Sequence, residues 1–269
     1  MSIVTDRKKT SYKNPMEGYK VIFIENNSEA ENADGIRGHL VAVGPSAGKR
    51  SFYDRFIKRF IDIILSLLGL IILSPLILII CIAVFVDDPG PILFAQKRIG
   101  LNKKYFKLHK FRTMKMSTPH DVPTHMLSNP DQYITKVGKF LRKYSLDELP
   151  QIGDILFTSS MSVIGPRPAL WNQDLLIAER DKYDANDVKP GLTGWAQING
   201  RDELEIPVKA ELDGVYANML RKGGVSAFMF DCRCFFGTVI NVVKSDGVVE
   251  GGTGSINSTN MTHADKKVE

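Results

Sequence analysis

Residues 71–80 read IILSPLILII, an apolar run that Ser74-Pro75 interrupts at its centre. A proline inside a helix removes one backbone donor and clashes with the preceding turn. The run belongs to a block from Phe60 to Val86 whose only charge is Asp62. One straight helix of this length could cross a bilayer core of about 30 Å, whereas the two legs beside Pro75, about 22 and 17 Å long, could not. The break therefore decides how the block sits in a membrane.

Basic residues flank both ends of this block. They are Lys49, Arg50, Arg55, Lys58 and Arg59 before it, and Lys97, Arg98, Lys103, Lys104, Lys107, Lys110, Arg112 and Lys115 after it. Because Lys and Arg concentrate on the cytoplasmic side, this pattern favours a re-entrant helix that enters, bends at Ser74-Pro75 and leaves on the same side. The Ser74 hydroxyl could bond the carbonyl that Pro75 leaves free. A kinked single span is the alternative that charge and geometry leave open.

The rest of the chain predicts an α+β fold that is mostly helical. Residues 1–48 are polar and are expected to form a largely irregular extension, with short strands at 19–24 and 39–43. The first twenty residues contain no apolar signal-peptide core. A basic, aromatic helix at 49–60 is expected to enter the headgroup region with its Lys and Arg reaching lipid phosphates. It continues into the membrane block, which ends at residue 86.

Residues 87–250 are expected to form a small cytosolic catalytic domain. Strands are predicted at 93–100 and 104–114, a loop at 117–130 and a helix at 134–144. The Gly/Ser/Asn-rich tail at 251–269 is expected to be mobile.

Charge and cysteine content limit the function classes. The formal net charge is +5, which is typical of proteins that meet phosphates. Cys81, Cys232 and Cys234 suggest neither a disulfide framework nor a zinc site. Many of the basic residues lie on either side of the apolar block, and the sequence contains no recognisable nucleic-acid-binding motif. Nucleic acid is therefore not an expected partner.

The stretch KFLRKYSLDELPQ at 139–151 holds the adjacent acids Asp147 and Glu148. Ser145 is expected to cap a helix that starts there, and carboxylates at a helix N-terminus are stabilised as anions. An anionic Asp is a nucleophile toward phosphorus or a ligand for Mg²⁺, and Arg142 lies upstream where it could hold phosphate oxygens. From these two residues alone, a capped and solvated helix start is the favoured interpretation.

Two further stretches are rich in rigid turns. SVIGPRPALW at 162–171 fixes Arg167 between two prolines, and Arg suits bidentate phosphate contact. KPGLTGWAQINGRDEL at 189–204 contains Arg201, although an Arg in a turn is often only a surface ion pair. The GPSAG of 44–48 fits a nucleophile elbow by letters, but a basic membrane-proximal helix follows it where an α/β sheet would be needed.

Six ordered motifs together resemble the bacterial sugar transferases, the monotopic polyprenyl-phosphate phosphoglycosyl transferases, in their short form. They are KRFIDIILSLLGLIILSP, GPILFAQKRIG, KFRTM, KFLRKYSLDELPQ, MSVIGPRP and KPGLTGWAQINGRDEL, and the likeness covers about residues 53–251. It implies a re-entrant helix broken at Ser74-Pro75 in the bacterial inner membrane, with the catalytic domain on the cytoplasmic face.

The resemblance also implies a reaction. Asp147 would attack the β-phosphate of a UDP-sugar, release UMP and pass the phosphosugar to undecaprenyl phosphate, which begins capsule, exopolysaccharide or other surface glycan assembly. Asp147 and Glu148 would hold Mg²⁺, the cofactor of the family, and Glu148 would assist in metal or proton handling. Arg142, Arg167, Lys110, Arg112 and Arg201 would bind phosphate. The sugar and the oligomeric state stay open, a homodimer included.

Three positions depart from the pattern of the resemblance: Tyr133 stands in the place of an Arg, Tyr144 in that of a Thr and Ser160 in that of an Asp. They leave the nucleophile intact and put any transfer of sugar specificity in doubt. The rival hypothesis is a membrane-docked basic scaffold that binds anionic lipid or a nucleotide without turnover. Such a scaffold would not need the acid pair, Arg142 or GPRP, and high salt should release it.

Overall fold

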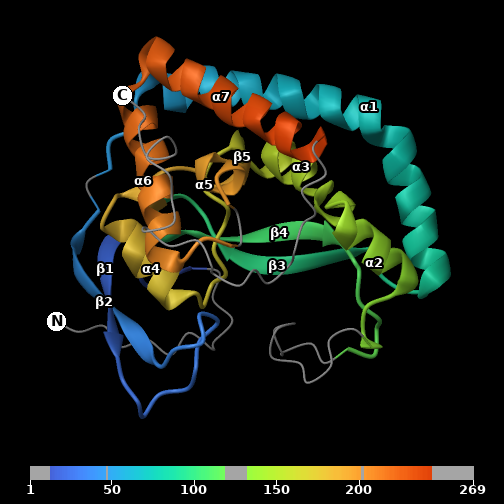
Figure 1. Cartoon of the computed structure of the whole chain (residues 1–269), viewed down its shortest axis with the longest axis horizontal. Helices are drawn as coiled ribbons and strands as arrows, with labels where there is room; N and C mark the ends of the chain where they lie inside the picture. Colours follow the sequence, from blue (N-terminus) through green and yellow to red (C-terminus); the bar gives the residue numbers. More distant parts are fainter. Residues whose placement is uncertain (1–12, 47, 119–131, 201–202, 244–269) are drawn as a thin grey trace.

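The computed structural model describes residues 13–46, 48–118, 132–200 and 203–243, and Figure 1 shows them as a mixed helix and sheet arrangement in which helices predominate. The predicted α+β, mostly helical class is confirmed. Arg201, most of the loop predicted at 117–130 and the tail predicted at 251–269 lie outside the described residues.

The strands of the described residues form three two-stranded sheets. The pairs are antiparallel β1 (Tyr19–Glu25) with β2 (Gly38–Pro45), antiparallel β3 (Leu93–Ile99) with β4 (Tyr105–Phe111), and parallel β5 (Ser162–Ile164) with β6 (Gly191–Thr193). The strands predicted at 93–100 and 104–114 are confirmed as β3 and β4.

Helices and helical turns make up much of the remaining described chain. The longest is α1 (Lys58–Asp87), which follows the π-helical turn η1 (Tyr53–Ile57) without a break. The others are η2 (Leu101–Lys103), α2 (Lys136–Lys143), η5 (Leu146–Glu148), α3 (Gln151–Gly153), η6 (Asp154–Thr158), α4 (Asp174–Asp181), η7 (Ala185–Asp187), α5 (Trp195–Ile198), α6 (Ile206–Lys222) and α7 (Gly224–Val243). The helix predicted at 134–144 is α2, and Thr135 caps it by accepting from the Gly138 N–H at 2.9 Å.

The helix α1 bends sharply partway along its length. One leg lies along the top of Figure 1 and the other descends on the right. Pro75 lies inside the helix and has no N–H for the carbonyl of Ile71, four residues earlier. Ser74 Oγ donates to that carbonyl at 2.8 Å, which is the bond predicted from the sequence. The helical hydrogen bonding continues through the break, so residues 58–74 (the first leg) and 76–87 (the second leg) form one bent helix.

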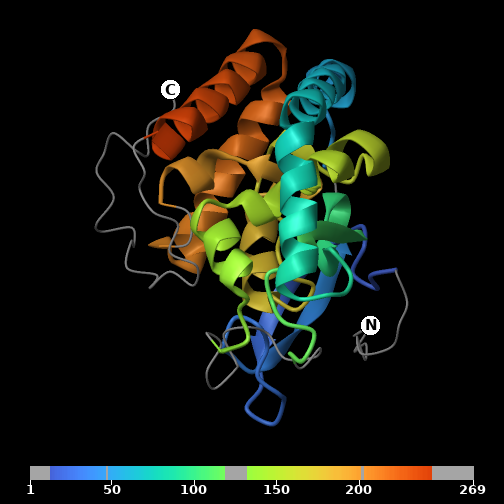
Figure 2. The same ribbon diagram turned by 90° about the vertical axis from the view of Figure 1, so that its right-hand side faces the viewer.

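Both legs pack against the rest of the molecule, as Figure 2 also shows. In the first leg, Asp62 is buried, and its Oδ1 accepts from Ser162 Oγ and Val163 N, each at 2.9 Å. In the second leg, Ile80 and Val84 are buried against β4 and α2. The helical stretch Tyr53–Asp87 is long and apolar enough to cross a membrane. Its outer side exposes Phe60, Ile63, Ile64, Leu67, Leu68, Ile71, Ile72, Leu78, Ile79, Ile82, Phe85 and Val86.

Two basic residues that were expected to reach lipid phosphates bind inside the protein. Lys58 is buried and pairs with Asp231 of α7 at 2.8 Å. Arg59 donates to the carbonyls of Ile155 and Leu156 at 2.6 and 3.1 Å. The prediction was wrong for these two residues because their partners come from distant parts of the chain, which a local reading of the basic flank does not show.

The N-terminal extension is more ordered than predicted. The strands expected at 19–24 and 39–43 are confirmed as β1 and β2, which form a hairpin. This hairpin buries Met16, Val21 and Leu40 against Leu176 and Ile177 of α4. We refer to residues 13–46 as the N-terminal hairpin.

The short parallel pair β5–β6 brings the motifs MSVIGPRP and KPGLTGW together. Gly165 and Gly191 meet here so closely that a Cβ on Gly191 would lie 2.0 Å from the Gly165 nitrogen. Glycine is therefore required at this contact. The Gly191 N–H donates to the Pro166 carbonyl at 2.9 Å, so the second motif supports the turn that carries Arg167.

Candidate active site

The adjacent acids lie on η5, a single turn between α2 and α3. Ser145 begins this turn with a left-handed φ of 54°, and its side chain makes no capping hydrogen bond. The prediction that Ser145 caps a helix at this point is therefore wrong. Leu146 and Leu149 fix the turn by packing into the apolar cluster beneath α2. Asp147 and Glu148 are consequently almost buried, at 4% and 8% exposure.

Two predicted cations converge on these acids from separate elements. Lys110 of β4 places its Nζ 2.9 Å from Glu148 Oε1 and 3.5 Å from Asp147 Oδ2. Arg167, on the turn after β5, donates from Nη2 to Glu148 Oε1 at 2.7 Å and from Nη1 to Oε2 at 3.3 Å. The structure thus brings together four of the residues that sequence analysis selected.

Electrostatics keeps Glu148 ionised. Burial on its own would raise the pKa of Glu148, because a carboxylate loses solvation there. The Arg167 guanidinium and the Lys110 ammonium outweigh burial and hold the pKa well below its ordinary value. Glu148 is the anchored acid of the pair, whereas the ion pair of Asp147 with Lys110 is longer. The two carboxylates are matched by two cations.

The remaining predicted phosphate ligands lie in different places. Arg142, at the end of α2, donates from Nε to Thr113 Oγ1 at 2.9 Å. Arg112 pairs with Asp88 and donates to the Pro91 carbonyl at 2.7 Å, so it holds the loop that leaves α1. Neither contact tests phosphate binding, which stays a prediction for both. Arg201 lies outside the described residues.

The three departures from the family pattern lie on the surface or near it. Tyr144 is 54% exposed and its ring contacts that of Phe140 in a tilted arrangement, with the centroids 4.9 Å apart. Ser160 Oγ lies 2.5 Å from Thr158 Oγ1, and Tyr133 is half-buried. Ser160 therefore contributes no charge to the region after η6, where a carboxylate would.

Sequence analysis missed Asp154, which is buried in η6. Its Oδ2 accepts the backbone N–H of His109 at 2.8 Å, and its Oδ1 lies 2.6 Å from His109 Nδ1. Since His109 precedes Lys110 in β4, Asp154 fixes the strand beside Lys110. A signal was present: Asp147, Gln151 and Asp154 follow the i, i+4, i+7 spacing that places polar side chains on one side of a helical segment.

The donor set suits a divalent metal only in part. Asp147 and Glu148 supply hard carboxylate oxygens, which Mg²⁺ prefers. Within the described residues, no group of three or more His, Cys, Asp or Glu side chains is placed to hold a metal. The site therefore fits an ion that takes its other ligands from substrate phosphates and water, the usual arrangement for Mg²⁺.

A family model described as "Bacterial sugar transferase" matches residues 53–245. The chain belongs to the bacterial sugar transferase family. The match includes α1, the acid pair, Lys110 and Arg167, and it begins after the N-terminal hairpin.

Several members of this family are similar to the chain. The UDP-glucose:undecaprenyl-phosphate glucose-1-phosphate transferase of Escherichia coli is 42% identical over 167 residues, which are 59% of this chain and 34% of that protein. The undecaprenyl-phosphate galactose phosphotransferase of Salmonella typhimurium is 34% identical over 197 residues, which are 66% of this chain and 39% of that protein. The exopolysaccharide production protein PSS of Rhizobium leguminosarum is 34% identical over 194 residues, which are 70% of this chain and 96% of that protein. The chain thus spans about a third of the first two relatives and nearly all of the third.

Proposed function

We propose that this sugar transferase moves a sugar-1-phosphate from a UDP-sugar to undecaprenyl phosphate and releases UMP. The observation that carries the proposal is the convergence of Lys110 and Arg167 on the Asp147–Glu148 turn. The names of the E. coli and Salmonella relatives support undecaprenyl phosphate as acceptor and a hexose as cargo. Because one relative is named for glucose and another for galactose, these names do not select the sugar.

In the first step, a carboxylate oxygen of Asp147 attacks the phosphorus that bears the sugar. The bond from this phosphorus to the bridging oxygen breaks, and UMP leaves with the electron pair. The product on the enzyme is a phosphosugar joined to Asp147 as an acyl phosphate. Lys110, 3.5 Å from Asp147, is placed to offset charge on the diphosphate during this step.

In the second step, an oxygen of undecaprenyl phosphate attacks the same phosphorus. The bond to Asp147 breaks, the carboxylate is restored, and the sugar leaves on a lipid diphosphate. Arg167 keeps Glu148 fixed beside the reacting acid throughout. Mg²⁺, held by Asp147 and Glu148 together with substrate phosphates, would supply further charge compensation.

We also propose that α1 enters the membrane without crossing it, with the catalytic domain on the cytoplasmic face. Lys58 and Asp87, at opposite ends of the helix, both bind the same folded body: Lys58 pairs with Asp231, and Asp87 Oδ2 accepts the Val137 N–H at 2.8 Å. A crossing helix would carry part of that body into hydrocarbon, where its unpaired polar groups would be costly. The exposed apolar side of both legs is left to face lipid.

The test is UMP release by purified protein in nanodiscs with Mg²⁺, undecaprenyl phosphate and a panel of UDP-sugars. Wild type should release UMP with at least one donor, and Asp147→Asn should release none while it stays in the membrane. Retained release in Asp147→Asn would contradict the covalent mechanism. A protein that releases no UMP and leaves the membrane at high salt would instead be the basic scaffold.

If wild type is inactive, Ser160→Asp becomes the informative variant. It restores the carboxylate expected from the family pattern beside η6. UMP release gained by Ser160→Asp would assign the inactivity to that substitution and keep the reaction class.

A further inference from the structure

We propose that the N-terminal hairpin, residues 13–46, is a positioning element of the active site that acts through α4 on the Arg167 turn. The hairpin lies outside the family match, which begins at residue 53. The catalytic part of this inference rests on the proposed function, whereas its structural part is tested separately below.

The hairpin holds the N-terminal end of α4. Asp34 Oδ2 accepts the backbone N–H groups of Leu175 and Leu176 at 2.7 and 3.4 Å. Gln173, the residue at the capping position, makes no side-chain capping bond. Because the first N–H groups of a helix have no partner within it, a carboxylate from elsewhere is a strong cap. The Ala33 N–H also donates to the Asn172 carbonyl at 3.1 Å.

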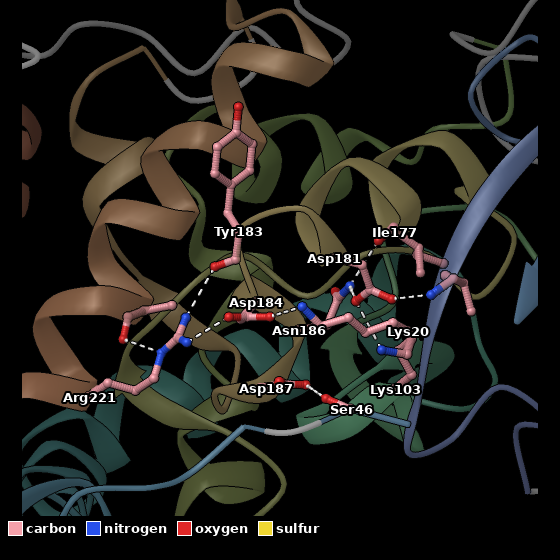
Figure 3. Close-up of polar contacts among 12 residues, drawn as sticks. Lys20, Ser46, Lys103, Ile177, Asp181, Tyr183, Asp184, Asn186, Asp187 and Arg221 are labelled. Carbon is pink, nitrogen blue, oxygen red and sulfur yellow. Dashed lines mark hydrogen bonds and ion pairs between the residues drawn. The ribbon is translucent and has the colours of Figure 1, made fainter. Parts of the chain in front are cut away.

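The hairpin also holds the C-terminal end of α4 (Figure 3). The Val21 N–H donates to Asp181 Oδ2 at 2.7 Å. Lys103, which has no exposed surface, donates to Asp181 Oδ1 at 2.9 Å, and Asn186 Nδ2 donates to the same oxygen at 2.5 Å. Asn14 closes the contact by donating to the Lys103 carbonyl at 2.8 Å. Asp181 thus joins the hairpin, η2 and the end of α4.

Three further contacts in Figure 3 extend this attachment. Lys20 of β1 pairs with Asp184 at 2.5 Å, and Arg221 of α6 pairs with the other oxygen of Asp184 at 2.6 Å. Ser46, at the end of the hairpin, donates to Asp187 Oδ1 at 2.5 Å. Between the two ends of α4, the apolar contacts of Met16, Val21 and Leu40 complete the interface.

Near its C-terminal end, α4 carries the residue that reaches the active site. Arg180 is 3% exposed and donates from Nε to Asp213 Oδ2 at 2.8 Å. Its Nη2 donates to the backbone carbonyl of Arg167 at 2.9 Å. The side chain of Arg167 makes the bidentate pair with Glu148. A continuous series of bonds therefore runs from the hairpin through α4 to the anchored acid.

The structural step can be tested by hydrogen exchange in Asp34→Ala, which removes the acceptor of two α4 amides. Exchange across residues 165–181 should become several-fold faster, while exchange in α7 stays unchanged. Asp34→Asn keeps an oxygen acceptor and should exchange like wild type. Unchanged exchange at 165–170 in Asp34→Ala, or equal acceleration in the Ala and Asn variants, would overturn the inference.

The catalytic step can be tested by a double-mutant cycle on UMP release. Asp34→Ala should lower kcat/KM roughly threefold or more in wild type and by a smaller factor in Arg167→Lys, because the cap acts through Arg167. If Asp34→Ala lowers kcat/KM by the same factor in wild type and in Arg167→Lys, or does not lower it in wild type, the route through Arg167 is overturned. Glu29→Ala is the matched control, since it removes an acid of the same hairpin that pairs with His39 at 2.6 Å. If neither wild type nor Ser160→Asp releases UMP, the proposed function fails and the exchange experiment alone decides this inference.

Discussion

Removing Arg167 should destabilise the protein more than removing both Arg167 and its partner. Glu148 is 8% exposed and takes two hydrogen bonds from Arg167 and one from Lys110. Breaking a buried ion pair by deleting one member costs about 3–5 kcal/mol when the remaining charge is left without a partner. Because Lys110 still donates to Glu148 at 2.9 Å, we expect the lower end of this range, about 3 kcal/mol. For a chain of this size, that corresponds to a fall in Tm of roughly 10 °C in Arg167→Ala.

The double variant Arg167→Ala/Glu148→Gln should recover part of this loss. Replacing both partners leaves no buried charge uncompensated, and such paired changes can be nearly neutral. Lys110 retains an acidic neighbour, since Asp147 lies 3.5 Å from its Nζ. Thermal unfolding in nanodiscs, followed by circular dichroism, measures the four Tm values of the cycle. A double variant that melts below Arg167→Ala would refute the reasoning.

The difference in Tm between wild type and Arg167→Ala should also depend on pH. The pKa of Glu148 is lowered in the folded protein, so its stabilising contribution is present above the ordinary value of 4.5 and is lost as pH falls. The Tm difference between wild type and Arg167→Ala should therefore be full at pH 7 and narrow as pH falls below about 4.5. A difference that stays constant down to pH 4 would show that lost packing, and not the charge, sets the effect.

Three other substitutions give separate tests. Burial raises the pKa of Asp34 from 3.8 to about 6, against the hydrogen bonds that lower it, so stability should fall as pH rises through this window by at most about 3 kcal/mol. Asp34→Asn should abolish this pH dependence of Tm. Parallel curves of Tm against pH for wild type and Asp34→Asn would contradict the assignment of the effect to Asp34. Asp62→Ala removes the acceptor of Ser162 Oγ and should cost about 1–3 kcal/mol by thermal unfolding, whereas an unchanged Tm would mean that water replaces it. Pro75→Ala restores a donor to Ile71 and favours a straight helix by about 3 kcal/mol. Single cysteines before and after α1, in a cysteine-free background, should be labelled from one side of the membrane in wild type and in Pro75→Ala, because both ends of α1 stay bound to the folded body. Labelling of wild type from opposite sides would contradict the re-entrant proposal.

The parts of the site that sequence predicts are those written in contiguous motifs. Asp147 and Glu148 are neighbours in the chain, and Arg167 stands between two prolines, so local letters reveal them. The role of Arg112 was not readable in this way. Its partner Asp88 lies across the β3–β4 hairpin, and only the folded chain shows that the guanidinium holds a loop.

Contacts between residues far apart in the sequence explain most of the features that sequence analysis did not predict. Lys58 looked like a headgroup-binding lysine, and its partner Asp231 lies in the last described helix. The N-terminal hairpin looked largely irregular because its polar residues dominate its composition. Its residues Met16, Val21 and Leu40 are nevertheless buried in one apolar cluster with α4. A two-stranded hairpin is marginal alone and becomes stable by packing on α4, which is a tertiary effect.

If α1 enters the membrane as we propose, its bend links membrane attachment to the geometry of the candidate active site. The first leg binds β5 through Asp62 and Val163, and β5 leads directly into the turn that carries Arg167. The second leg caps α2 through Asp87, and α2 leads into the turn that carries Glu148. Each half of the Arg167–Glu148 pair is therefore attached to a different leg of one helix. A change in the angle between the legs would move these two attachments relative to one another, so we expect the hydrogen bond from Ser74 to the Ile71 carbonyl to help hold the geometry of the candidate site.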